Sequence, residues 1–275
     1  MKKILGVIIT YNPDLNLLNK NIISFIDSVD AVIIVDNGSK TISELFRLES
    51  DTIKVLSNSS NLGIADALNQ ALFYAQEHHF NYVLTMDQDS FFESATIQKL
   101  LLGFKNGKTA IVCPSLKDMN SRHFVTVSEE YVEIFTAITS GCLCNVDILT
   151  SVGGFDSKMF IDYVDFELCL RLQKKGFKII QSQQSVLCHH LGESKIHYFL
   201  GMPIICTNHS PLRRFYYARN KIYIYKKYFF VFPLFVLRDV LSFGKTIASI
   251  LFFEKLKREK IKMITKGIWQ GLFFI

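Results

Sequence analysis

Asp87 and Asp89 are the residues whose types and spacing most clearly suggest chemistry. They flank Gln88 directly after the apolar run 82–86. Two carboxylates this close repel each other unless a cation lies between them. A hard divalent ion such as Mg²⁺ is typically held by one or two carboxylates, while water and phosphate oxygens complete its coordination. A structural interpretation, in which an aspartate caps the following helix, explains only one of the two acids.

The segments around these acids predict an α/β fold. Short apolar runs rich in β-branched residues alternate with stretches of helical periodicity. The runs are apolar throughout, as is typical of a mostly parallel sheet covered by helices on both faces. The expected strands are 4–10, 31–35, 53–56, 82–86, 110–113, 177–180 and 185–188, and the expected helices are 16–26, 64–78, 94–104 and 164–175.

Polar residues follow four of the expected strands. Open α/β sheets bind their ligands at the carboxyl ends of the strands. A purely structural sheet gives no reason for four strands to deliver polar groups to one edge, so this placement favours a ligand site. The residues are Thr10-Tyr11-Asn12, Asp36-Asn37, Asn61 with Gly63, and Asp87 with Asp89.

A second group of acids, Asp162, Asp165 and Glu167, lies at the start of the expected helix 164–175. Helix capping accounts well for Asp162 and less well for three acids together. The functional interpretation makes one of them a general base beside a reacting hydroxyl, and the spacing does not distinguish which. His189 and His190 follow a strand, where one of them could be a metal ligand or both could be structural.

The bulk composition predicts a globular protein of 275 residues with a net charge of +6. The six cysteines show no metal-binding CxxC spacing, which predicts buried, reduced thiols in a cytosolic protein. The apolar run near the N-terminus is short and lacks a cleavage site, so a first strand is expected rather than a signal peptide. No stretch reaches the ~18 consecutive apolar residues of a transmembrane helix.

Taken together, these motifs resemble the family 2 glycosyltransferases of GT-A fold, and among them the bacterial rhamnosyltransferases that build O-antigen and other cell-surface polysaccharides. The resemblance spans about residues 4 to 225, and each motif alone is weak. The matching residues, in order, are Val7–Asn12, Val35–Ser39, Asn61–Ala65 with Ala67 and Asn69, Asp87–Asp89, Thr139–Gly141, Gly153–Asp156, Asp165–Arg171, His189 with Leu191–Glu193, and Tyr216-Tyr217 with Arg219-Asn220.

The resemblance implies a role for each matching position. Asp165 corresponds to the base that deprotonates the acceptor hydroxyl for inverting attack, although Val164 stands where the family often has glutamate. Asp89 and His189 correspond to the ligands of Mg²⁺ or Mn²⁺, with His190 as an alternative. Ser140, Gly141 and Asp162 are expected on the acceptor side. The expected nucleotide-sugar-binding residues are Thr10, Tyr11, Asn12, Asp36, Asn37, Asn61, Gly63, Asn69, Asp87, Gln88 and Arg219.

The resemblance favours dTDP-L-rhamnose as donor, with a UDP-hexose as the alternative. It implies a saccharide acceptor, which we expect to be lipid-linked, and a cytoplasmic protein at the inner face of the cell membrane. Two other classes fit less well. A dinucleotide-binding oxidoreductase needs a GxGxxG turn after the first strand, which is absent here. A nucleic-acid-binding module is opposed by the acids at the sheet edge.

The C-terminal part of the chain predicts a helical extension. We expect a catalytic domain over residues 1–225 and an extension over 226–275. The stretch 229–253 is apolar but is interrupted by Arg238, Asp239 and Lys245, and residues 255–266 add six cations. This pattern favours helices on an anionic membrane surface. The alternatives are a helical cap on the catalytic domain or a dimer interface, and the oligomeric state stays open.

Overall fold

The computed structural model contains a nine-stranded mixed sheet that forms most of one unit of the chain. This N-terminal unit comprises residues 1–160 and 164–190, and a C-terminal unit comprises residues 161–163 and 191–275. The structure describes residues 2–93, 96–118, 129–189, 195–199 and 202–273. The side chains of residues 117, 118, 189, 195–199 and 202–205 also lie outside this description.

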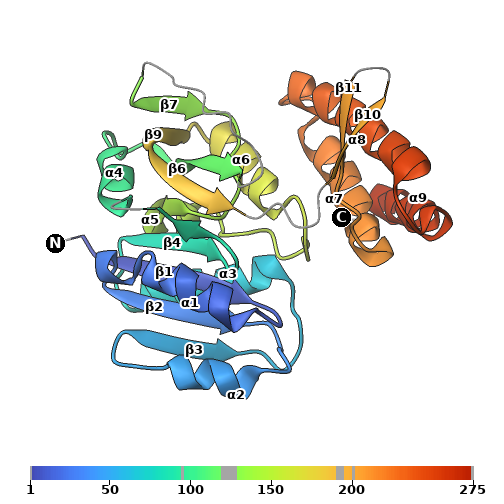
Figure 1. Ribbon diagram of the computed structural model, residues 1–275. Helices are drawn as coiled ribbons and strands as arrows, with labels where there is room; N and C mark the ends of the chain where they lie inside the picture. The colour runs from blue at the N-terminus through green and yellow to red at the C-terminus, as the bar shows by residue number, and fades with distance from the viewer. Residues whose placement is uncertain (1, 94–95, 119–128, 190–194, 200–201, 274–275) are drawn as a thin grey trace. The chain divides into compact units, whose positions relative to one another are not determined.

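The strands and helices of the N-terminal unit alternate over residues 4–87, as the sequence predicts, whereas some of the later strands follow one another without a helix between them (Figure 1). They are β1 (Ile4–Thr10), α1 (Leu15–Ile23), β2 (Ala31–Asp36), α2 (Ile42–Leu45), β3 (Ile53–Ser57), α3 (Ile64–Glu77), β4 (Tyr82–Asp87), β5 (Phe91–Phe92), α4 (Ile97–Leu102), β6 (Thr109–Asp118), β7 (Tyr131–Ile134), β8 (Cys142–Asn145), α5 (Val146–Ser151), α6 (Val164–Lys174) and β9 (Lys178–His189). The two strands expected at 177–180 and 185–188 form the single strand β9.

The strand order is β3-β2-β1-β4-β8-β6-β9-β5, with β7 on β9. The first four strands of this order are parallel, so their carboxyl ends meet at one edge. β8 runs antiparallel to both β4 and β6. The sequence pattern does not reveal β8, because only three consecutive residues of it are apolar, Cys142 to Cys144, and it pairs with strands distant in the sequence. The sheet is therefore mixed, with a parallel half that carries the expected polar edge.

Helices cover both faces of the parallel half. Ile4 and Ile8 of β1 pack with Leu18 and Ile22 of α1 in the main core. Since side chains alternate along a strand, the intervening residues of β1 face the other way, where α3 packs against β1, β2 and β4 (Figure 1). The buried stripe of α3 is the one that the sequence predicts: Ala65, Leu68, Ala71, Leu72 and Ala75.

The C-terminal unit contains a β-hairpin and three helices. These are β10 (Lys195–Phe199), β11 (Met202–Cys206), α7 (Pro211–Tyr228), α8 (Pro233–Phe253) and α9 (Lys257–Phe273). The domain boundary that we expect between residues 225 and 226 falls inside α7, which is continuous across it. Among the described helices, none combines the length and hydropathy needed to cross a lipid bilayer.

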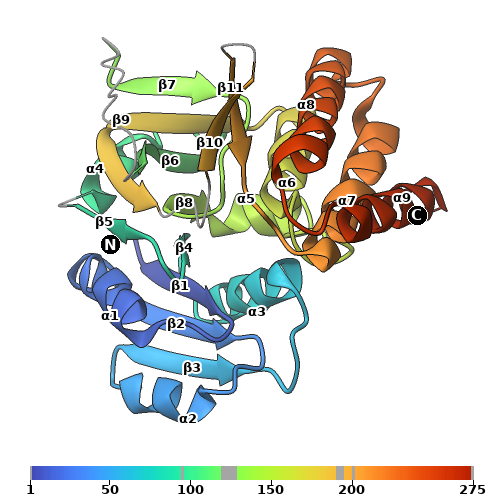
Figure 2. The ribbon, with the colours of Figure 1, turned by 45° about the vertical axis from the view of Figure 1, so that its right-hand side comes forward.

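Close packing joins α7 and α9, which lie side by side in both views (Figures 1 and 2). A Cβ atom on Gly267 would lie 2.4 Å from the carbonyl oxygen of Phe215, and one on Gly271 would lie 2.7 Å from that of Arg219. Glycines four residues apart let two helix backbones approach this closely. The GxxxG spacing is visible in the sequence, so this contact could have been anticipated.

Two buried charged residues of the C-terminal unit, Glu254 and Lys221, are paired with opposite charges. Glu254 accepts hydrogen bonds from Arg214 at 2.6 Å and from Lys260 at 2.8 Å. Lys221 is fully buried and its ammonium donates to Asp239 at 2.7 Å. Leaving any one of these charges alone would be costly, because burial removes the water that solvates it. The pairs therefore fix α8 and α9 relative to α7.

Candidate functional site

Thr10 and Asp36 end adjacent parallel strands and lie opposite each other in the register of β1 and β2. The Thr10 hydroxyl donates to Asp36 Oδ1 at 2.9 Å, and Asp36 Oδ2 accepts from the backbone N–H groups of Gly38 at 3.1 Å and Ser39 at 2.8 Å. Both side chains are fully buried. The carboxylate that the sequence predicts as a base or ribose contact thus holds the Asp36–Ser39 turn and presents no surface to a ligand in this structure.

The loops after β1 and β2 are tied together above that turn. The Asn12 N–H donates to the Ser39 hydroxyl at 2.7 Å, and the Lys40 N–H donates to Asn12 Oδ1 at 3.0 Å. Tyr11 and Asn12 are exposed, and Asn12 adopts a left-handed backbone with φ 47°. The surface at this edge is therefore formed by Tyr11 and Asn12, while Asp36 supports it from below.

The two aspartates of the acidic motif lie at the carboxyl end of β4, as predicted. Asp87 is exposed and Asp89 is half-buried. Gln88 accepts a hydrogen bond from the Tyr11 N–H at 2.9 Å, which joins this motif to the loop after β1. Among the described residues, the structure records no hydrogen-bond donor to the Asp89 carboxylate and no ion-pair partner for it. Its oxygens suit a hard cation.

Asn21 of α1 supports the same turn, and the sequence analysis missed it. Its side-chain amide donates to the Asp87 carbonyl oxygen, and the residue is fully buried. Its Oδ1 has no hydrogen-bond partner among the described residues. The signal was a polar residue beside Ile22 on the apolar stripe of α1, where an asparagine needs a specific partner.

Asn37, Asn61 and Gly63 shape the loop before α3. The Asn37 amide donates to the Gly63 carbonyl oxygen at 3.0 Å, and Asn61 Oδ1 accepts from the Gly63 N–H at 2.9 Å. Gly63 has φ 92°, and a Cβ atom there would lie 2.7 Å from the Phe160 carbonyl oxygen. We expected Gly63 to permit close approach to the nucleotide. In this structure the close approach is to the backbone of Phe160.

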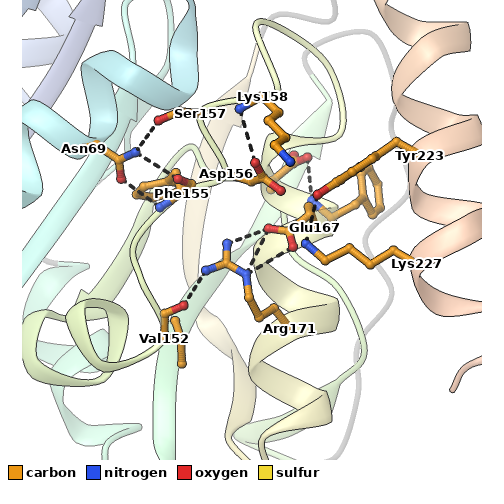
Figure 3. Close-up of polar contacts among 12 residues, drawn as sticks. Asn69, Val152, Phe155, Asp156, Ser157, Lys158, Glu167, Arg171, Tyr223 and Lys227 are labelled. Atoms are coloured by element: carbon orange, nitrogen blue, oxygen red, sulfur yellow. Dashed lines mark hydrogen bonds and ion pairs between the residues drawn. The ribbon is translucent and has the colours of Figure 1, made fainter. Parts of the chain in front are cut away.

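Asn69 of α3 is committed to the loop that follows α5 (Figure 3). Its Oδ1 accepts from the Phe155 N–H at 2.8 Å, and its Nδ2 donates to the Phe155 carbonyl oxygen at 2.8 Å and to the Ser157 hydroxyl at 3.2 Å. Gly154 leaves room for these hydrogen bonds, because a Cβ atom there would lie 2.5 Å from Asn69 Oδ1. In this structure the Asn69 side chain positions the Gly-Gly-Phe-Asp loop, and its contact with the nucleotide stays a prediction.

Ser140 and Gly141 lie beside the end of β4, because β8 pairs with β4. The Ser140 hydroxyl accepts from the Asp87 N–H at 3.1 Å, and the Gly141 N–H donates to the Thr85 carbonyl oxygen at 2.7 Å. Gly141 has φ 77°, and a Cβ there would lie 2.9 Å from the Pro114 ring. The antiparallel strand thus brings this distant motif to the acidic turn.

The three acids near the start of α6 have different partners. Asp162 forms a bidentate ion pair with Arg213 within the C-terminal unit, with Nη2–Oδ1 at 2.9 Å. Glu167 is fully buried and pairs with Arg171, which also donates to the Val152 carbonyl oxygen at 2.7 Å (Figure 3). Asp165 Oδ1 accepts from the neighbouring Phe166 N–H at 2.8 Å.

The capping role considered for Asp162 is not observed. Asp162 and Tyr163 are consecutive left-handed residues, with φ 63° and 67°, and Asp162 is engaged by Arg213 rather than by the first turn of α6. The Asn220 amide donates to the carbonyl oxygens of Ile161 at 2.9 Å and Asp162 at 2.8 Å. These contacts from α7 hold the strained segment that precedes Asp165 in the chain.

Asp165 and Thr139 both line a small, apolar void of about 10 Å³. The void is also lined by three buried thiols: Cys142, Cys144 and Cys169. Burial raises the pKa of the Cys144 thiol to about 12, and it raises the pKa of Cys169 as well. Such thiols are protonated at neutral pH and are poor nucleophiles, so the carboxylate is the base available at this position. All six cysteines are free and buried, as expected.

His189 is the last residue of β9, and its side chain lies outside the described residues, as does all of His190. Phe91 of β5 lies opposite Cys188 in an antiparallel pair. Extending that register by one residue places the backbone of His189 opposite Ser90, next to Asp89. Within the described part of the chain, no cluster of three histidine, cysteine or acidic side chains could hold a metal. Among the described side chains, Asp87 and Asp89 are the carboxylates at the end of β4 that could contribute to a metal site.

Arg219 lies on α7 in the C-terminal unit. It is 7% exposed and lines a cleft of about 510 Å³ between α7 and α9. Its Nε and Nη2 donate to Asn220 Oδ1 at 3.0 and 2.9 Å. The phosphate contact that the resemblance implies for Arg219 stays a prediction.

Solved structures share this architecture at low sequence identity. The chain matches GalNAc-T7, solved with UDP, GalNAc and Mn²⁺, with a TM-score of 0.60 and 14% identity over 82% of this chain and 50% of that one. It matches S. aureus TarS residues 1–349 with a TM-score of 0.54 and 14% identity over 99% of this chain and 72% of that one. The chain thus spans about half the length of GalNAc-T7. The chain therefore has the GT-A fold that these structures share.

Sequence comparison narrows this class. Residues 7–139 match the family described as Glycosyl transferase family 2. The chain is also 28% identical over 241 residues to dTDP-rhamnosyl transferase RfbF of Shigella flexneri, covering 82% of this chain and 80% of that protein. These matches identify the chain as a glycosyltransferase that uses a nucleotide-sugar donor; its residues 7–139 resemble family 2, and the chain as a whole resembles rhamnosyltransferases.

Proposed function

We propose that this protein transfers L-rhamnose from dTDP-L-rhamnose to a hydroxyl of a saccharide acceptor, with inversion at the anomeric carbon. The donor is taken from the relative of 28% identity, which is a dTDP-rhamnosyl transferase. One observation on this chain supports the proposal. β8 places Ser140 against Asp87, and Thr139, next to Ser140, lines the same void as Asp165. The acidic turn and the candidate base therefore belong to one neighbourhood of the N-terminal unit.

We propose that Asp87 and Asp89 form the donor-diphosphate end of the site. Asp87 is exposed, Asp89 is half-buried, and both offer the hard oxygen donors that Mg²⁺ and Mn²⁺ prefer. His189 is a further candidate ligand, since it follows Cys188, which pairs with Phe91, two residues after Asp89. A bound cation would neutralise charge that develops on the departing nucleoside diphosphate. Tyr11 and Asn12, exposed at the end of β1, are the proposed contacts for the nucleoside.

The buried members of the motif set act by positioning. Asp36 holds the turn under Asn12, and Asn69 holds the loop at Phe155. Asn37 and Asn61 hold the backbone of Gly63 from both sides. Such supporting contacts matter for catalysis because reacting groups must be held close to their productive geometry. Loss of one of them is expected to weaken donor binding without touching the donor directly.

Asp165 is the proposed general base. Its carboxylate accepts a hydrogen bond from the Phe166 N–H, and the residue lines the same void as Thr139. Asp165 stands in the first turn of α6 and is half-buried. It would take the proton from the acceptor hydroxyl as that oxygen attacks the anomeric carbon, and the electron pair of the breaking bond would leave with the nucleoside diphosphate.

The proposed acceptor is lipid-linked, and the C-terminal unit suggests why. Leu234, Leu237 and Leu241 of α8 are 69%, 53% and 69% exposed and lie on one face of the helix. Arg238 and Lys245, both exposed, flank that stripe. Apolar side chains bordered by cations are typical of helices that lie in the surface of an anionic membrane. We therefore propose peripheral contact at the cytoplasmic face of a cell membrane, in the synthesis of a surface polysaccharide.

Thermal protection by a panel of donors tests the proposal. The protein would be heated with Mg²⁺ and dTDP-L-rhamnose, UDP-glucose or UDP-N-acetylgalactosamine, each at the same concentration. A donor present at about 100 times its Kd stabilises the protein by ~2.7 kcal/mol. We expect dTDP-L-rhamnose to give the largest rise in Tm and to be consumed when a saccharide acceptor is added. A larger rise with a UDP-hexose would establish the alternative donor, and no rise with any sugar nucleotide would overturn the proposal.

A further inference from the structure

The chain's single tryptophan, Trp269, lies in a cleft that no role described above uses. The cleft has a volume of about 510 Å³ and is built by α7 and α9 alone. Trp269 and Phe273 of α9 are 66% and 67% exposed, although both are large and apolar. Solvent-exposed aromatic residues that line a cleft are candidates for contact with an apolar or amphiphilic partner.

Cations lie among these aromatic side chains. Arg219 is only 7% exposed, and its guanidinium lies 4.9 Å from the ring centroid of Tyr216. Burial lowers the pKa of Arg219, because it removes water that would solvate the charged guanidinium. Lys266 stands beside it, 5.9 Å from the ring centroid of Phe215. The planar guanidinium is well suited to phosphate.

The surrounding segment matches an anionic membrane in charge. Residues 229–275 contain eight lysines and arginines against three acids, so they carry +5 of the net charge of +6. Two of those acids, Asp239 and Glu254, are paired with cations inside the unit. Cationic segments with aromatic side chains at headgroup depth are attracted to negatively charged lipid surfaces.

We propose that the α7–α9 cleft binds the phosphate of an anionic membrane lipid, with Arg219 and Lys266 as the cations and Trp269 and Phe273 in the interfacial layer. This deepens the membrane contact proposed above and rests on it, because it gives that contact a defined headgroup site. Arg219, which the resemblance places near the donor phosphate, would then hold a phosphate of the membrane.

Trp269 reports on this cleft directly, because no other tryptophan contributes to the emission. The full-length protein would be titrated with phosphatidylcholine vesicles with and without phosphatidylglycerol, some carrying brominated acyl chains. We expect a blue shift with the anionic vesicles only, together with quenching by the bromines. Lys266→Gln should weaken vesicle binding about fivefold, the value of one cation near an anionic surface. Lys262→Gln removes an exposed charge from the same helix outside the cleft lining, and it should weaken binding less than about twofold.

Each of the remaining outcomes would contradict the proposed lipid site in the cleft, and each would point to a different explanation. Vesicle binding without quenching of Trp269 would leave the membrane contact standing and remove the cleft from it. Equal loss in the two lysine variants would mean diffuse attraction rather than a site. The same emission change with inorganic pyrophosphate alone would mean a site for soluble phosphates. No binding to anionic vesicles would overturn the cleft and the membrane contact together, while leaving the donor measurements untouched.

Discussion

Replacing Asp239 by asparagine should strongly destabilise the C-terminal unit. Asp239 accepts from Lys221 Nζ at 2.7 Å, from the Tyr225 hydroxyl at 2.7 Å and from the Tyr163 hydroxyl at 2.6 Å. Lys221 is fully buried, so the variant leaves its ammonium without a counter-charge. Burial already lowers the pKa of Lys221, and Asp239 opposes that shift.

Breaking a buried ion pair at one partner costs about 3–5 kcal/mol. The Asp239 side chain is 15% exposed, so we expect the lower end of that range, about 3 kcal/mol. With a urea dependence of about 1 kcal/mol per molar, the unfolding midpoint should fall by about 3 M. The emission of Trp269 would follow this unfolding, since it lies in the same unit.

Two controls separate the ion pair from other effects. Arg238→Gln changes the neighbouring exposed charge and should alter stability by less than about 0.5 kcal/mol. Lys221→Met combined with Asp239→Leu removes both charges, and it should be less destabilising than Asp239→Asn alone. If Asp239→Asn lowered stability by no more than Arg238→Gln, the reasoning about the buried lysine would be refuted.

Three further predictions follow from the geometry. Asp165→Asn should reduce the turnover number for transfer by about 10² to 10⁴-fold. The Kd of the donor, measured by calorimetry, should stay within about twofold. Near-normal turnover would contradict the assignment of Asp165 as the base. Gly63→Ala should destabilise the fold by about 1–3 kcal/mol in denaturation, because φ is 92° and the added Cβ meets Phe160, whereas Gly107→Ala, with nothing within 4 Å, should be neutral. Burial, and to a lesser extent two nearby arginines, lowers the pKa of His209 from 6.5 to about 4. The free energy of unfolding should therefore be at its full value above pH 6.5 and decline as the pH falls towards 4. Denaturation at several pH values should show that His209→Gln flattens this decline.

The parallel half of the sheet was predictable because each of its strands is marked by residues that are adjacent in the sequence. Runs such as 4–10 and 82–86 are apolar throughout and end in polar residues, so strand ends and the acidic edge could be read directly. β8 could not be read in this way. Only three consecutive residues of it are apolar, Cys142 to Cys144, and only pairing with β4 and β6 defines it as a strand. The contact between Ser140 and Asp87 depends on that pairing.

The identities of several site residues were predictable, but their partners were not. Asn69 and Asp36 stand in the expected motifs, yet their side chains bind the protein's own backbone. Asp162 faces Arg213, 51 residues later in the chain, and no local pattern encodes that distance. A polar side chain in a loop can form hydrogen bonds either with a ligand or with the backbone of the loop, and sequence patterns do not distinguish between these two possibilities.

The binding of dTDP in the presence and absence of Mn²⁺, by the native protein and by Asp89→Asn, tests the central claim most directly. The claim is that acidic side chains at the end of β4 hold a divalent cation on the donor's diphosphate. Calorimetric titration should show that Mn²⁺ tightens dTDP binding about tenfold or more in the native protein, and that Asp89→Asn loses most of this gain. Binding of dTDP that depends equally on Mn²⁺ in both proteins, or does not depend on Mn²⁺ in either, would contradict the account.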